Sequence, residues 1–457
     1  MSDFSLQPYI AGKKRIHLVG IGGVSMSALG ELLMHLGVKV TGSDRTETET
    51  TDKLTALGAV ITYAHLPQNV EGADLIIRTA AVHDGNPEIA HARELGIPVI
   101  ERAQAWGFLM TEYKQAVCIS GTHGKTTTTS MMTLAGMQAG IDPTVMVGSN
   151  LPAIGGTLRI GAHDCFIAES CEYTNSFHSF HPTVAVVLNV DADHLDFFKD
   201  IDDIIASFHH FCTLVPEYGA IIVNRDSANA MKAVEGIDRT RMTFGSTAEA
   251  DVYPEHVTDR NGYYSFDVMH KGKLYTHVDL SVPGYHNMLN ALACCAASIF
   301  LGLQGDAVGE GLKQFTGSAR RFQKTGNMAN GALVVDDYAH HPTEMEATLK
   351  TAKEMNFDRI ICVFQPHTYS RTKALLPEFV QALKLCDKAI LADIYAAREK
   401  NTYGVSSKDI ADQLDGGEYY DSFERIEARL KEIAQPNDLI LTMGAGNVFE
   451  IGTAICE

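Results

Sequence analysis

The segment that most constrains the fold covers residues 120–127 and reads Ser-Gly-Thr-His-Gly-Lys-Thr-Thr. It follows an apolar run, residues 116–119, that predicts a short buried strand, and it precedes residues 128–140, which predict a helix. A strand, a glycine-rich turn and a helix form a cradle for phosphate groups, because backbone N–H groups crowd around the anion and the helix N-terminus adds partial positive charge. The sequence therefore predicts an α/β domain with a phosphate site at this turn.

Two side chains of this turn suit the chemistry of a bound nucleotide. Lys125 would reach the outer phosphates, and the Thr126 hydroxyl would bind a magnesium ion. The general pattern has four residues between its first glycine and the Gly-Lys pair, which would place that glycine at position 119. This chain has Ile119 there, and its nearest upstream glycine, Gly121, gives the shorter spacing Gly-x-x-Gly-Lys-Thr. The alternative is a glycine-rich turn with a surface lysine. The strand and helix on either side favour the phosphate site.

A second glycine-rich turn lies near the N-terminus. The elements predicted around it are a strand, a turn, a helix and a second strand, at residues 15–19, 20–27, 28–36 and 38–41. Asp44 follows about 20 residues beyond the glycines, as in a dinucleotide-binding βαβ unit. The third glycine of that fingerprint would fall on Ser25, so an NAD-dependent oxidoreductase remains only an alternative. The pattern predicts a phosphorylated ligand, or one with a ribose, against residues 20–25 and near Asp44.

Polar side chains follow two strands that are predicted in the middle of the chain. The strand at residues 165–168 is followed by Glu172, and the strand at residues 184–188 is followed by His194. In an open parallel sheet, ligands bind at the carboxyl ends of the strands. Glu172 and His194, with Thr126, are therefore candidate magnesium ligands. Turn or cap roles are the alternative for the neighbouring acids Glu169, Asp191 and Asp196.

An apolar helix is predicted to open within residues 283–290 and to extend to residue 303. Asn287 and Asn290 lie at i, i+3 spacing near its start. Asparagine at a helix start is usually a cap. The alternative is that one of the two amides contacts the edge of a purine.

The last third of the chain predicts a small α/β domain with a site of its own. Its strands are expected at residues 333–335, 360–364, 389–391 and 439–442, and a polar cluster follows each of them. Arg371 is the strongest candidate in these clusters, because its planar fork suits a carboxylate. His340 and His341 are adjacent, and a structural role is as plausible for them as a catalytic one.

Length, charge and cysteine usage limit the classes of protein that fit. The chain has 457 residues, which suggests about three domains, expected at residues 1–111, 112–318 and 319–457. Its formal net charge of -19 argues against nucleic-acid partners and membrane surfaces. The nine cysteines are scattered, which predicts a protein with reduced thiols. We expect a cytoplasmic protein without membrane insertion, because the sequence shows no signal peptide and no apolar run long enough to span a bilayer.

Taken together, the motifs resemble those of the Mur ligases of peptidoglycan precursor synthesis. The residues on which this resemblance rests occur in order along essentially the whole chain. They are the segments 20–27, 121–127, 189–196, 284–290, 319–323, 336–344 and 364–372, together with Glu172. The resemblance implies three α/β domains: a Rossmann-like N-terminal domain that binds a UDP-sugar, a central P-loop ATPase with a mainly parallel sheet, and a Rossmann-like C-terminal domain that binds an amino acid.

The resemblance also implies roles for individual residues. The UDP-sugar would contact Gly22, Gly23, Val24, Ser25, Ser43 and Asp44. ATP would contact Gly121, Thr122, His123, Gly124, Lys125, Thr126, Thr127, Asn287, Arg321 and Asp336. Magnesium would be held by Thr126, Glu172 and His194, and the amino acid by Tyr338, His340 and Arg371. Many relatives carry arginine where this chain has Thr368, which leaves Arg371 as the surer carboxylate partner.

The implied reaction uses ATP to join L-alanine to the carboxylate of UDP-N-acetylmuramate. The expected oligomeric state is a monomer or a weak homodimer. The carboxylate attacks the γ-phosphate, and the amine then attacks the acyl phosphate, with Lys125, His340 and Arg371 as catalytic residues. Two alternatives remain besides the oxidoreductase. One is a ligase that attaches a recycled tripeptide to the same sugar nucleotide, and the other is a binding module switched by a nucleotide.

Overall fold

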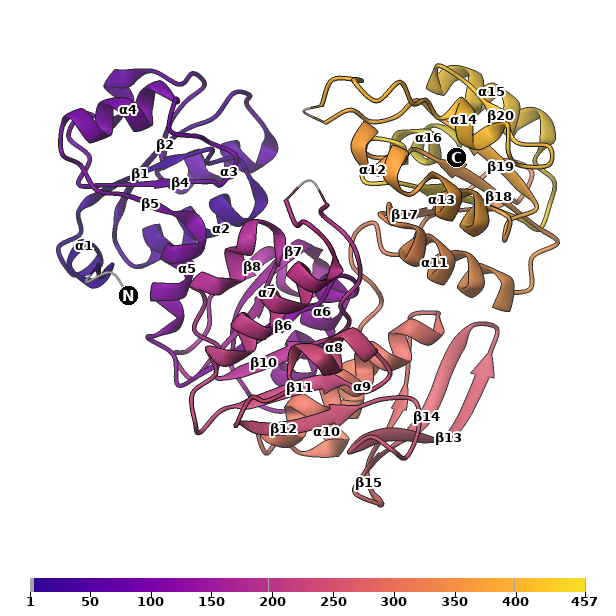
Figure 1. The fold of residues 1–457 in the computed structure, drawn as a ribbon, viewed down its shortest axis with the longest axis horizontal. Helices are drawn as coiled ribbons and strands as arrows, with labels where there is room; N and C mark the ends of the chain where they lie inside the picture. The colour runs from indigo at the N-terminus through magenta and orange to yellow at the C-terminus, as the bar shows by residue number, and fades with distance from the viewer. Residues whose placement is uncertain (1–3, 196, 398, 457) are drawn as a thin grey trace. The chain divides into compact units, whose positions relative to one another are not determined.

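The computed structural model describes residues 4–195, 197–397 and 399–456. Asp196, one of the predicted turn or cap acids, lies outside these residues. The described chain forms α/β units built on mainly parallel sheets, so the predicted fold class is confirmed (Figure 1). The expected domain boundaries stay a prediction.

The N-terminal sheet is parallel and has the strand order β3-β2-β1-β4-β5. Its strands are β1 (Arg15–Val19), β2 (Lys39–Ser43), β3 (Val60–Thr62), β4 (Leu75–Arg78) and β5 (Val99–Glu101). Its helices are α1 (Gln7–Ala11), α2 (Val24–His35), α3 (Glu49–Ala56), η1 (Pro67–Val70), α4 (Pro87–Glu94) and α5 (Arg102–Met110). Helix α2 begins at Val24, four residues before the predicted start, so the second half of the glycine-rich turn is its first turn.

The central sheet places the predicted phosphate strand between two parallel neighbours. In the order β12-β11-β10-β6-β9-β7-β8, β6 pairs with β10 and β9, and only β8 is antiparallel to its neighbour. The strands are β6 (Gln115–Ser120), β7 (Thr144–Leu151), β8 (Gly156–Arg159), β9 (Cys165–Glu169), β10 (Val184–Val187), β11 (Ala220–Asn224) and β12 (Thr240–Phe244). The helical segments are α6 (Lys125–Gln138), η2 (Pro152–Ile154), η3 (Tyr173–Ser179), α7 (Ile201–Thr213) and α8 (Ala228–Ala233).

Helix α6 is unusual because its buried surface is rich in hydroxyl groups. Three of these hydroxyls are satisfied within the helix. Thr129, Ser130 and Thr133 each donate a hydrogen bond to the carbonyl four residues earlier, at 2.8, 2.8 and 2.7 Å. These three side chains are therefore buried with their hydroxyl groups paired.

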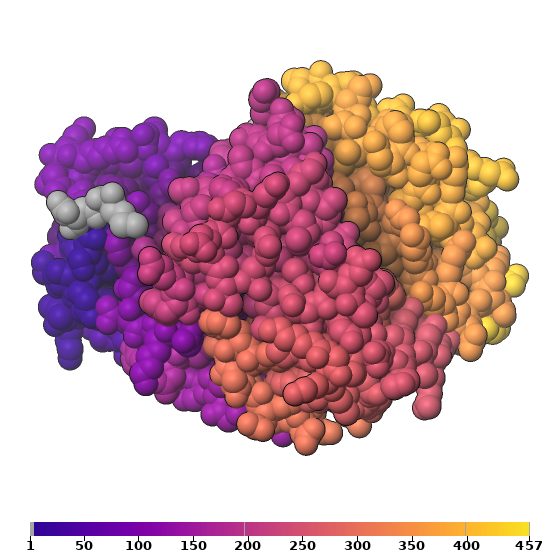
Figure 2. Space-filling view, turned by 60° about the horizontal axis from the view of Figure 1, so that its bottom comes forward, coloured from indigo at the N-terminus to yellow at the C-terminus, as the bar shows by residue number. Residues whose placement is uncertain are grey.

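The antiparallel strands β13 (Val252–Arg260), β14 (Tyr263–His270) and β15 (Lys273–Asp279) follow. The turns between them are Asn261-Gly262 and Lys271-Gly272, and all four residues have positive φ, from 50° to 82°. This is the type I′ geometry that matches the twist of a hairpin. Helices α9 (Tyr285–Phe300) and α10 (Gly305–Lys313) come next, and Figure 2 shows this pink to orange part of the chain at the surface.

The C-terminal sheet has the order β16-β17-β21-β18-β19-β20, in which only β16 is antiparallel. Its strands are β16 (Gln323–Asn327), β17 (Leu333–Asp337), β18 (Arg359–Phe364), β19 (Lys388–Leu391), β20 (Glu418–Tyr419) and β21 (Asp438–Met443). Its helices are α11 (Pro342–Glu354), α12 (Tyr369–Ala374), α13 (Leu376–Leu383), α14 (Lys408–Ala411), α15 (Phe423–Ile433) and α16 (Phe449–Ile455).

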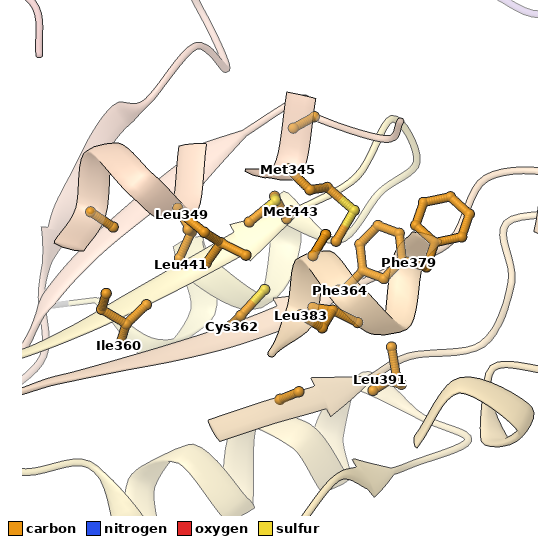
Figure 3. Close-up of a cluster of buried hydrophobic side chains, with 14 of the residues drawn as sticks. Met345, Leu349, Ile360, Cys362, Phe364, Phe379, Leu383, Leu391, Leu441 and Met443 are labelled. Carbon is orange, nitrogen blue, oxygen red and sulfur yellow. The ribbon is translucent and has the colours of Figure 1, made fainter. Parts of the chain in front are cut away.

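Helices cover both faces of this C-terminal sheet. On one face, Leu349 of α11 and Phe379 of α13 pack with Phe364 of β18 and Leu441 of β21 (Figure 3). On the other, side chains of α15 and α16 pack against the alternate residues of the same strands. Burial on both faces explains why these strands are continuous apolar runs in the sequence.

Two composition-based expectations can be compared with the structure. Cys118, Cys294, Cys295 and Cys362 are free, buried thiols. A search of the described residues finds no helix with the length and apolar character needed to cross a lipid bilayer.

Candidate active site

The predicted phosphate turn lies between β6 and α6, and α6 begins at Lys125, three residues before the predicted start. Gly124 is the N-cap and has φ of 84°, a conformation that glycine adopts without steric cost. A Cβ atom at Gly121 would lie 2.9 Å from Cβ of Leu188, so this position also requires glycine. The turn therefore exposes backbone rather than side chains where phosphates would bind.

Asn189, just beyond β10, clamps the turn through a pair of reciprocal hydrogen bonds. Its Oδ1 accepts from the backbone N–H of His123 at 2.7 Å, and its Nδ2 donates to the carbonyl of His123 at 3.1 Å. The N–H of Thr122 donates to the carbonyl of Asn189 at 3.1 Å, and the Thr122 hydroxyl accepts from the N–H of Asp191 at 2.9 Å. Asn189 begins the segment 189–196, and the sequence pattern indicates no role for it.

Lys125 lies folded over its own turn and pairs with Glu172. Its Nζ donates to the carbonyls of Gly121 and Thr122 at 2.5 and 3.0 Å and lies 2.9 and 3.2 Å from the two carboxylate oxygens of Glu172. Burial is the largest single influence and lowers the pKa of Lys125, but the charge of Glu172, the hydrogen bond to it and the nearby charge of Glu169 together outweigh burial, so the pKa is raised. The lysine is thus held as a cation at the mouth of the phosphate turn.

Thr126, the next residue, is tied to a second acid. Its hydroxyl donates to Oε1 of Glu169 at 3.0 Å, and the N–H of Gly148 donates to Oε2 of Glu169 at 2.7 Å. Glu169 ends strand β9, and its side chain supports the phosphate turn rather than capping a turn of its own. The sequence signal for this role is its position at a strand end, which Glu172 shares.

Hard oxygen donors therefore surround the turn, and such donors fit Mg²⁺, which commonly uses one or two carboxylates together with substrate phosphates. Among residues 4–195, 197–397 and 399–456, no group of three His, Cys, Asp or Glu side chains has the arrangement of a metal site. His194 has a positive φ of 53°, and its N–H donates to Oδ1 of Asp193 at 2.7 Å. The metal roles of Thr126, Glu172 and His194 stay predictions.

The structure brings the N-terminal glycine-rich turn together with Asp44. The N–H of Gly22 donates to Oδ2 of Asp44 at 2.8 Å. Gly23 is the N-cap of α2, and Val24 is 49% exposed. The Ser25 hydroxyl accepts from the indole N–H of Trp106 at 3.1 Å. These contacts fix the turn, and its UDP-sugar role stays a prediction.

Ser43, also assigned to the UDP-sugar, contacts a buried acid that the sequence did not single out. Its hydroxyl donates to Oε2 of Glu88 at 2.7 Å. Burial would raise the pKa of Glu88, but hydrogen bonds from His17, Ser43, Asn69 and His65 lower it to about 2. Glu88 is therefore a buried carboxylate that fixes the side chains at the end of β2.

In the C-terminal sheet, Asp336, which was assigned to ATP together with Arg321, pairs with the neighbouring arginine, Arg320. Nε of Arg320 lies 2.8 Å from Oδ2 of Asp336, and its other nitrogens donate to the carbonyls of Gly446 and Gly444 at 2.9 and 2.6 Å. Arg320 has φ of 58°, in the left-handed region. Both guanidinium groups lie over the ring of Tyr338, that of Arg320 at 5.0 Å and that of Arg321 at 5.4 Å from its centroid.

The three residues assigned to the amino acid belong to one cluster. The ring centroid of His340 is 5.4 Å from that of Tyr338 and 5.8 Å from that of His367, and Nη1 of Arg371 lies 3.2 Å from Nδ1 of His367. Burial lowers the pKa values of His340 and His367 to about 4, so both rings are neutral at pH 7. Arg371 pairs with Asp193 through Nε at 3.3 Å and Nη2 at 2.9 Å.

Asn287 lies in the first turn of α9 and is buried, so the helix-cap interpretation is wrong. Its Nδ2 donates to the carbonyl of Pro283 at 2.7 Å, and Nδ2 of Asn290 donates to its Oδ1 at 3.1 Å. Both polar atoms of the Asn287 amide are thus used within the helix start. The adenine role stays a prediction.

Comparison with known proteins agrees with this architecture. Three domain descriptions match the chain in order: the Mur ligase family, catalytic domain over residues 15–114, the Mur ligase middle domain over residues 119–298, and the Mur ligase, glutamate ligase domain over residues 320–446. The chain belongs to the Mur ligase family, and the resemblance inferred from its motifs is confirmed.

Within this family, the chain is similar over nearly its full length to ligases that act on UDP-N-acetylmuramate and L-alanine by name. The UDP-N-acetylmuramate--L-alanine ligase of Caldanaerobacter subterraneus subsp. tengcongensis is 47% identical, with 97% of each chain covered. The ligase of the same name from Agathobacter rectalis is also 47% identical, with 96% of each chain covered. The crystal structure of the UDP-N-acetylmuramate-alanine ligase of Thermotoga maritima is 30% identical and covers 97% of this chain and 98% of its own, with a TM-score of 0.81.

Proposed function

We propose that this protein is an ATP-dependent ligase that joins L-alanine to the carboxylate of UDP-N-acetylmuramate. The observation that carries the proposal is the phosphate turn with Lys125 and two supporting acids, in a chain 47% identical over nearly its full length to ligases of that name. ATP and sugar nucleotides are cytoplasmic metabolites, so the reaction belongs in the cytoplasm. A monomer or weak homodimer is the expected oligomeric state.

In the first chemical step, the protein mainly neutralises charge on the phosphates and forms no covalent bond to the substrate. The substrate carboxylate attacks the γ-phosphorus, the bond to the β-phosphate oxygen breaks, and ADP leaves with the bonding electrons. Lys125, released from Glu172, offsets charge on the transferred phosphoryl group, and the backbone of the turn holds the outer phosphates. Thr126, Glu172 and His194 would hold the magnesium ion, which supplies further charge neutralisation when bound.

The second step takes place at the carbonyl of the acyl phosphate. The amine of L-alanine attacks this carbon, inorganic phosphate leaves, and the ammonium proton is lost. The neutral ring of His340 can accept a hydrogen bond from the amine, and Arg371 binds the carboxylate of the amino acid. Because Asp193 already pairs with Arg371, the amino acid must share this guanidinium with Asp193 or displace it.

Reconstitution with a panel of amines tests the proposal. The protein is incubated with ATP, magnesium and UDP-N-acetylmuramate, and L-alanine, L-serine, glycine or tripeptide is supplied as the amine. We expect phosphate release and an amide product that require both the sugar nucleotide and L-alanine. A preference for the tripeptide would select the recycling ligase instead. Phosphate release that is indifferent to the sugar nucleotide would show that the protein is not this ligase.

A further inference from the structure

A cavity of about 120 Å³ lies beside the phosphate turn but contains none of its residues. Its walls come from the start of α2, from α5, from β7 and from the segment after β9. Trp106, Met146 and Phe180 make part of the lining apolar, and Ser25, Arg102 and Glu169 add polar groups. A mostly apolar pocket with a few convergent polar side chains is typical of a ligand site.

Arg102, the first residue of α5, is the cationic group in this lining. It is half-buried, and within the described ranges it makes no ion pair and no side-chain hydrogen bond. Burial lowers the pKa of Arg102, since the guanidinium has lost water without gaining a paired acid. In contrast, Arg78 at the end of β4 pairs with Asp84 at 2.6 Å. Arg102 is thus a desolvated cation with donors available to a ligand.

The lining of the cavity includes one residue of the N-terminal glycine-rich turn and one residue that contacts the phosphate turn. Ser25 belongs to the glycine-rich turn at the start of α2, and Glu169 holds Thr126 of the phosphate turn. Both oxygens of Glu169 already accept hydrogen bonds, so this acid does not compete for Arg102. Cys171 also lines the cavity.

We propose that Arg102 binds the carboxylate of the sugar-nucleotide substrate and selects for sugars that carry this acid. The inference rests on the proposed function, in which that carboxylate must lie between the sugar-nucleotide turn and the phosphate turn. The pyrophosphate of the same substrate has another partner, the backbone N–H groups at the N-terminus of α2. A planar guanidinium without a protein partner suits a planar carboxylate, which it can bind through two hydrogen bonds.

Three related ligands test the role of Arg102. Dissociation constants are measured by calorimetry for UDP-N-acetylmuramate, for UDP-N-acetylglucosamine, which lacks the carboxylate, and for UDP. We expect Arg102→Gln to weaken binding of the muramate about 10- to 100-fold and to leave the other two within about twofold. Arg102→Lys keeps the charge without the fork and should recover part of the loss. Arg93→Gln, which removes a surface arginine that is paired with Asp84, serves as the matched control.

The ratio of the two sugar-nucleotide affinities decides the outcome. If Arg102→Gln weakens UDP and both sugar nucleotides equally, the arginine binds the pyrophosphate and the inference is wrong. Unchanged affinity for all three also overturns it. Thermal unfolding and ATP binding of the variant report whether the fold survives. If the wild-type protein itself fails to prefer the muramate and forms no amide, it is the proposed function that has failed, whatever Arg102 does.

Discussion

Replacing Asn189 tests whether a single side chain pre-forms the phosphate turn. Asn189→Ala removes the two hydrogen bonds, of 2.7 and 3.1 Å, that hold the backbone of His123. At about 1 kcal/mol each, their loss costs about 2 kcal/mol. If the turn must then be ordered by the nucleotide, affinity for ATP falls about 30-fold. Calorimetric titration of each variant with a non-hydrolysable ATP analogue and magnesium measures the loss.

Two further variants separate this clamp from nonspecific effects. Asn189→Asp keeps the acceptor for the His123 N–H but sets an oxygen against the His123 carbonyl and adds negative charge near the phosphates. We therefore expect it to bind the analogue more weakly than Asn189→Ala. Asn229→Ala removes one hydrogen bond, of 3.0 Å, to the carbonyl of Val190 and should change affinity less than threefold, or about 0.6 kcal/mol. Near-wild-type affinity in both Asn189 variants would refute the reasoning.

Four other predictions follow from the contacts described. Lys125→Ala should lower turnover at least about 100-fold while the circular dichroism spectrum is retained, and wild-type turnover would remove this lysine from the mechanism. Arg320→Gln should destabilise the chain by about 3 kcal/mol, because buried Asp336 loses its partner, whereas Arg321→Gln should change the denaturation midpoint little. Thr368 has φ of 67° and ψ of 146°, so Thr368→Gly should stabilise by about 1 kcal/mol in urea unfolding, and Thr368→Ala should not. Burial raises the pKa of Asp337 to about 6, so the native state holds this proton more tightly than the unfolded state. The contribution of Asp337 to the free energy of unfolding should therefore fall by about 2 kcal/mol between pH 4 and 6, and Asp337→Asn should lack this fall.

Strands were predicted well because strands that are buried on both faces appear in the sequence as continuous apolar runs. The runs that became β6, β9 and β10 are apolar on both faces, and each ends at a polar cluster. Helix starts were harder. Helices α2 and α6 begin three or four residues before their predicted starts, since glycine, serine and threonine in a first turn are indistinguishable in sequence from the loop before it.

Partners within the site were the least predictable feature. Arg320 and Arg321 are adjacent and chemically identical, and only the folded backbone shows that Arg320 pairs with Asp336. Asn189 and Glu169 meet the phosphate turn only because β6 lies between β10 and β9. Such pairings depend on strand order, which local patterns do not encode.

The threonine-rich start of α6 has a consequence for the order of folding. Residues 126–129 are all threonine, a β-branched residue with modest helix propensity, and hydroxyls that bond to carbonyls four residues earlier weaken an isolated helix slightly. Segment 125–138 is therefore a poor helix nucleus and depends on packing against a completed central sheet. The helix N-terminus that would receive the phosphates then forms late, so a partly folded chain has little affinity for ATP.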